Sequence, residues 1–172
     1  RSDRNQAAAP RIVPYVFFGM GEDEPILEPE QATRWVRSMS REGAKGVKFF
    51  GAPPEIMRAA LEEIRNQGMG AAMHHAQLAV VNWNVLDSAR AGMTTMEHWY
   101  GLPEAMFEDR VIQNYPLDYN YANEQHRFGE AGRLWKQSAA PGSETWNAVR
   151  DELIALDFTL NPTLTIYEAS RD

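Results

Sequence analysis

The segment GAKGVKFFGAPPEIMRAALEEIRNQGMGAAMHHAQLAVVNWNVLDSARAGMTTMEHWYG (residues 43–101) decides the fold. It contains three short runs of strand-forming residues, which end in Lys48, His75 and His98. The runs recur about every 25 residues, which is the length of one strand-plus-helix unit of a parallel α/β fold. The carboxyl ends of consecutive strands in a β/α barrel open onto one shared face, where loops build the active site. We therefore expect these three polar side chains to form one site.

The composition narrows the classes of function. The chain has 172 residues, 44% of them hydrophobic, which suffices for one domain with a buried core. A formal charge of -7 argues against a nucleic-acid partner, and no run of Lys or Arg predicts binding to a membrane surface. Neither a long apolar span nor a signal-peptide pattern occurs in the sequence. Because cysteine is absent, any metal must be bound by histidine, carboxylate or modified lysine.

Strand-like and helix-like segments alternate along most of the chain. The apolar run 11–21 predicts a strand buried on both faces. Helices are predicted from Pro29 to Gly43, from Pro53 to Gly68, from Leu78 to Ala91 and from Ser143 to Leu156. The other expected strands are 46–50, 70–75, 93–97 and the segment from Asp157 onward, with no helix after it. The apolar faces expected for the helices are Ala32, Trp35, Val36 and Met39; Ile56, Ala60 and Ile64; Val81, Val85 and Ala89; and Trp146, Val149, Leu153 and Leu156.

A long insert, about 103–143, interrupts this alternation. Insertions of this length in a compact fold are usually lids or substrate walls. The remaining units number about five, too few to close an eight-stranded barrel of about 250 residues. The segment 19–24, GMGEDE, lacks the third glycine and the helix start of a nucleotide-binding fingerprint. The sequence therefore predicts one α/β domain over 1–172 that is part of a TIM (β/α)8 barrel.

Five motifs follow one another along the chain: APRIVP (9–14), GAKGVKFF (43–50), MHHAQ (73–77), TTMEH (94–98) and LNPTL (160–164). They resemble, in turn, strands 3 to 7 of the amidohydrolase superfamily, in its imidazolonepropionase-like and prolidase-like branch. Their order and spacing together make the resemblance specific, and it covers most of the chain outside the insert. It implies that the chain corresponds roughly to strands 3 to 7 of the barrel, with the insert after the sixth strand.

The resemblance implies a binuclear metal centre, usually of zinc, that activates a water; other divalent metals can occupy such sites. Lys48 would be carboxylated and would bridge both metals, because an ammonium group cannot coordinate a metal and a carbamate can. His75 and His98 would each supply a nitrogen ligand. Alternation sends only one of the pair 74/75 inward. The family's His-Ala pattern selects His75, with Ala71 and Met73 on its face, and His74 remains the alternative.

The predicted function is hydrolysis of a C–N bond in a small amide, peptide-like or cyclic amide substrate. Tyr100, Thr163 and Tyr167 are candidate substrate contacts. Lys48 favours the binuclear hydrolases over the family's mononuclear deaminases, which lack this lysine. Lactone or phosphotriester hydrolysis at the same site is the alternative within the enzymes.

A non-catalytic role of the protein is the other alternative. The sequence has no His-x-His, and its only aspartate after the LNPTL motif is Asp172, too close to it to be the family's strand-8 aspartate. These features predict either a segment of a longer enzyme or a barrel remnant that assembles with a partner through its exposed strand edges. The sequence leaves the oligomeric state open.

Overall fold

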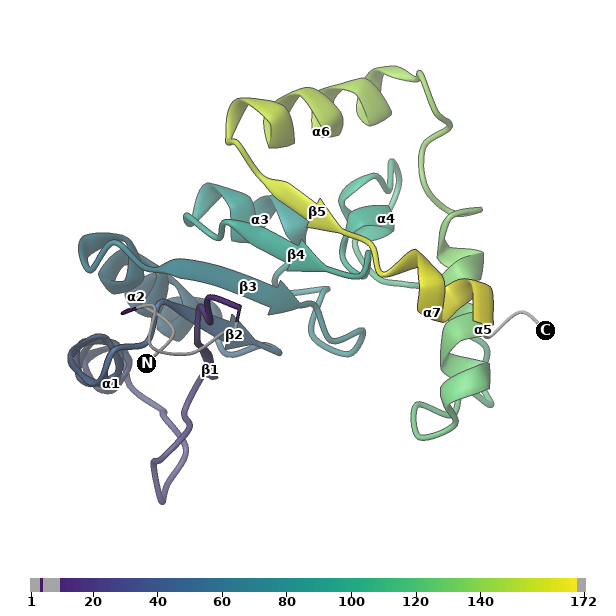
Figure 1. Ribbon diagram of the computed structural model, residues 1–172. Coiled ribbons are helices and arrows are strands. Elements are labelled where there is room, and N and C mark those ends of the chain that lie inside the picture. Colours follow the sequence, from purple (N-terminus) through teal and green to yellow (C-terminus); the bar gives the residue numbers. More distant parts are fainter. Residues whose placement is uncertain (1–3, 5–9, 170–172) are drawn as a thin grey trace.

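The chain forms a five-stranded parallel sheet in which neighbours in sequence are neighbours in space (Figure 1). The computed structural model describes Arg4 and residues 10–169, without the side chains of Tyr167 and Ala169. The strand order is β1-β2-β3-β4-β5, and all four pairings are parallel. The α/β class is therefore confirmed. The strands are β1 (Tyr15–Phe17), β2 (Gly46–Phe49), β3 (Gly70–His74), β4 (Thr95–Glu97) and β5 (Thr159–Asn161).

Helices connect the strands. In the described residues they are α1 (Pro29–Glu42), α2 (Pro54–Asn66), α3 (Val85–Arg90), α4 (Leu102–Ala105), α5 (Glu124–Leu134), α6 (Glu144–Ala155) and α7 (Leu164–Ala169). Their ends follow local chemistry that the sequence predicts. Gly43 ends α1 in the left-handed conformation, at φ 100°. The Ser143 hydroxyl caps α6 by accepting a hydrogen bond from the Trp146 N–H at 3.3 Å. None of the helices over 10–169 is long and apolar enough to cross a membrane.

The register divides the sheet into two different faces. Lys48 lies beside Phe17 and Ala72, and Ala72 lies beside Thr95, so these four side chains share one face. The opposite face carries Val47, Phe49, Ala71 and Met73, which belong to the buried core packed against α1 and α2. The face with Lys48 borders an open hollow of about 390 Å³. We call it the open face of the sheet.

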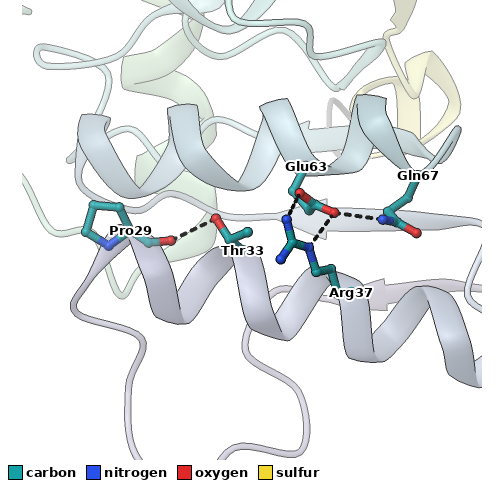
Figure 2. Close-up of polar contacts among 5 residues, drawn as sticks. All are labelled: Pro29, Thr33, Arg37, Glu63 and Gln67. Carbon is teal, nitrogen blue, oxygen red and sulfur yellow. Dashed lines mark hydrogen bonds and ion pairs between the residues drawn. The ribbon is translucent and has the colours of Figure 1, made fainter.

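An ion pair between an exposed arginine and a buried glutamate joins α1 to α2 (Figure 2). The guanidinium of Arg37 donates to both carboxylate oxygens of Glu63, at 2.9 and 3.1 Å, and the Gln67 amide donates to the same carboxylate at 2.7 Å. Glu63 is almost fully buried, and the Arg37 bond holds its pKa below its usual range. These contacts satisfy a carboxylate that would otherwise be costly to bury.

Four predictions about the elements are wrong. The first strand covers only Tyr15–Phe17, and Tyr15 and Phe17 are 45% and 49% exposed, because β1 is an edge strand and both point to the open face. The helix expected from Leu78 begins only at Val85, where the Asn84 side chain accepts a hydrogen bond from the Leu86 N–H at 2.9 Å. Val81 and Leu156, both expected on apolar helix faces, are 37% and 40% exposed. β5 is followed by α7, although no helix was expected there.

Candidate functional site

Three polar side chains occupy the carboxyl-terminal part of consecutive strands. Lys48 is the third residue of β2 and is half-buried, His74 ends β3, and His98 directly follows β4. The imidazole rings of His74 and His98 cross edge to face with their centroids 4.9 Å apart. The ring of Tyr100 lies 5.3 Å from that of His74 and 6.0 Å from that of His98. Two strand ends thus bring two imidazoles together, next to a largely buried tyrosine.

The backbone at His98 is strained. Its φ is 66°, in the left-handed region that non-glycine residues rarely adopt. Its N–H donates to the Asn161 carbonyl at 2.8 Å, and its Nδ1 lies 2.6 Å from the hydroxyl of Thr163. Thr163 also has a positive φ, of 50°. Such residues cluster at functional sites, where the surrounding structure holds them in place. Thr163, a candidate substrate contact, thus bonds His98 directly.

Burial shifts the titration of this cluster toward its uncharged forms. Burial, reinforced by His98, Lys48 and Arg127, lowers the pKa of His74 to about 4. Burial and the positive charge of Lys48 lower the pKa of His98, against the opposing effect of Glu97. Burial also lowers the pKa of Lys48, which Glu97 partly offsets. At neutral pH His74 is therefore an uncharged imidazole with an available lone pair, the form that ligates metals.

His75 lies away from this cluster, contrary to the sequence-based choice. It is fully buried, and its Nε2 lies 2.7 Å from the Ser88 hydroxyl on α3. A Cβ at Gly101 would lie only 3.2 Å from its ring. The argument that His75 shares a face with Ala71 and Met73 holds, but that face packs against helices. His74, the alternative, shares the face of Lys48 and meets His98.

The insert supplies site residues that the sequence did not reveal. Its helix α5 contributes Glu124, Arg127 and Phe128 to a cavity of about 150 Å³, together with His74, His98, Tyr100 and Ile166. Beside this cavity, the Asn161 amide donates a hydrogen bond to the Glu97 carboxylate at 2.9 Å. Glu97 and Lys48 line the hollow of the open face. The side chain of Tyr167, a further candidate, lies outside the described residues.

Side chains that could ligate a metal lie at this edge of the sheet. Over the described residues, no group of three or more His, Asp or Glu side chains is arranged to hold a metal ion. His74 and His98 offer two nitrogens, and Lys48, if carboxylated, would add oxygen donors on the same face of the sheet. Two imidazoles and one further ligand are a usual protein contribution to a catalytic zinc ion. One divalent ion would therefore need all three side chains, and the expected second ion would need further ligands.

Comparison of the chain with models of known protein families gives no match, and neither does comparison with curated proteins.

Proposed function

We propose that the chain is part of a (β/α)8-type barrel hydrolase that binds a divalent metal, most simply zinc, through Lys48, His74 and His98. The observation that carries the proposal is the meeting of two neutral imidazoles, from the ends of β3 and β4, on the face that bears a half-buried lysine. The consecutive parallel strands support the barrel, because barrel strands follow one another in this order. The proposed reaction is cleavage of a C–N bond in an amide or peptide-like substrate.

The chemistry of each residue follows from its surroundings. A bound divalent ion would supply Lewis-acid polarisation of the substrate carbonyl and a more acidic water. His74 and His98 remain unprotonated ligands, because burial disfavours their charged forms. Burial also favours the neutral amine of Lys48, which is the form that reacts with carbon dioxide. The Thr163 hydroxyl orients His98 by bonding its Nδ1, which leaves Nε2 for a ligand.

Zinc binding by paired lysine variants tests the proposal. The protein is equilibrated with zinc and bicarbonate, dialysed, and analysed for metal by mass spectrometry. Lys48→Ala should lose the zinc, while Lys45→Ala, which changes an exposed lysine three residues earlier, should keep it. Carboxylation is read separately, as a carbamate signal in the NMR spectrum after addition of isotopically labelled bicarbonate. Equal zinc content in both variants would rule out Lys48 as a ligand.

A non-catalytic assembly role is the second candidate, and the exposed aromatic side chains of Tyr15, Phe17 and Phe50 favour it. Phe17 and Phe50 stack with their ring centroids 5.5 Å apart. A wild-type protein that binds no zinc and turns over no amide, yet associates through this aromatic surface, would support this role over the hydrolase.

A further inference from the structure

The insert places a cation beside the two histidines. Arg127 lies in the first turns of α5, and its side chain lines the same cavity as His74 and His98. Figure 1 shows α5 beside α7, beyond the carboxyl ends of β4 and β5. The cavity is therefore bounded by strand ends on one side and by the insert on the other.

The guanidinium of Arg127 is held in place by the turn before α5 and by α5 itself. It donates from Nη1 to the Tyr121 carbonyl at 3.0 Å. It also lies over the rings of Tyr121 and Phe128, 5.1 and 5.6 Å from their centroids. The side chain is 23% exposed, so it is oriented without being sealed off. A guanidinium carries several N–H donors in a planar fork, and one bond to a carbonyl leaves others for a ligand.

Charge and size define the ligand. Among the described residues that line the cavity, Glu124 is the one carboxylate. It lies 3.5 Å from Arg127 Nη2 and is 67% exposed, so this ion pair is weak and easily displaced. The cavity of about 150 Å³ has room for a carboxylate with a small substituent.

We propose that Arg127 binds a free carboxylate of the substrate, so that the substrates are N-acylated amino acids or short peptides with a free carboxyl end. Arginine and a carboxylate can form two parallel hydrogen bonds, which fixes the direction of the ligand. A substrate anchored in this way presents the amide next to its carboxyl end to His74 and His98. Cleavage of such a substrate rests on the proposed hydrolase function, but binding of its carboxylate by Arg127 does not.

Binding of two matched probes tests the proposal without turnover. N-acetylglycine carries the carboxylate, and N-acetylglycinamide replaces it by a neutral amide of the same shape. Dissociation constants are measured from NMR shifts of the histidine side chains at low salt. We expect wild type to bind the acid about 10- to 100-fold more tightly than the amide, the range for a hydrogen bond to a charged group. Arg127→Gln should remove this preference, and Arg127→Lys should keep part of it.

Two further variants separate recognition from damage to the fold. Glu124→Gln removes the competing carboxylate and should tighten binding of the acid a few-fold, the opposite direction to Arg127→Gln. Arg133→Gln changes an arginine on the same helix that pairs with Glu130, and should leave the preference unchanged. Equal binding of acid and amide by wild type, failure of both to bind, or a preference retained in Arg127→Gln would overturn the proposal. If wild type prefers the acid over the amide but binds no zinc, only the proposed hydrolase is refuted.

Discussion

Ser88→Ala should strongly destabilise the protein, because the Ser88 hydroxyl is the shared partner of two buried rings. The Trp83 indole N–H donates to Ser88 Oγ at 2.7 Å, and His75 Nε2 lies 2.7 Å from the same oxygen. All three side chains are almost completely buried. An indole N–H can only donate, so the oxygen accepts from Trp83, and its own hydrogen can be donated to His75.

The magnitude follows from the groups left without a partner. Each buried polar group that loses its hydrogen bond costs about 1–3 kcal/mol. Alanine at position 88 leaves two such groups, so the sum is about 2–6 kcal/mol, and we expect the lower part of that range because the rings can shift into the vacated space. The free energy of unfolding is measured by urea denaturation, where a loss of about 2–4 kcal/mol appears as a lower midpoint with an unchanged slope.

Ser38→Ala is the matched control. Ser38 lies within α1, and its hydroxyl makes one exposed contact, with Glu42 at 3.4 Å. Alanine is the better helix former, so the change should stay within about 0.5 kcal/mol. If Ser88→Ala costs no more than Ser38→Ala, the buried triad of Ser88, His75 and Trp83 is not formed. The assignment of His75 to a structural role would then fail.

Two other substitutions test the packing and the charges. Gly101→Ala should lower the free energy of unfolding by at least about 1–2 kcal/mol, because Gly101 has a φ of 89° and a Cβ would press on the His75 ring. Gly129→Ala is the control: Gly129 lies within α5 with open space around it, so alanine should stabilise the protein by up to about 1 kcal/mol. Thermal unfolding measures both changes. Glu63→Gln should destabilise most at neutral pH: the pKa of Glu63 is lowered in the folded state, so its contribution is present above the unfolded pKa of about 4.3 and is lost as the pH falls through the lower folded value. The difference in urea midpoint between wild type and Glu63→Gln should therefore be smaller at about pH 3 than at about pH 7. A difference that stays the same at both pH values, as expected for the exposed Glu62→Gln, would contradict this.

Local signals predicted α1 and α2 well. Pro29 and Gly43 bracket α1, and Ala32, Trp35 and Val36 form its buried face, because helix ends and stripes depend on residues a few positions apart. The helix expected from Leu78 begins later because of another local signal. Asn84 caps α3, and a helix that began before Asn84 would lose this cap.

The choice between His74 and His75 could not be made locally. Alternation states that they point to opposite faces, but it does not state which face the helices cover. That depends on the pairing of Lys48 with Ala72 and on the packing of Val47 and Phe49 against α1 and α2, which are contacts between separate elements of the fold. Arg127 was missed for a similar reason, since α5 contains two glycines and has a weak apolar stripe, so its placement over the strand ends depends on tertiary structure.

The strained backbone of His98 connects the metal proposal to the carboxylate proposal. His98 is held in the left-handed region by bonds to Asn161 and Thr163, and both partners belong to the end of β5 and the loop that leads into α7. The same α7 contributes Ile166 to the cavity that contains Arg127. The orientation of the His98 ring and the width of the cavity that contains Arg127 therefore depend on one segment, 161–166. A ligand that binds Arg127 and packs against Ile166 would also steady Thr163, and through it the imidazole that we assign to the metal.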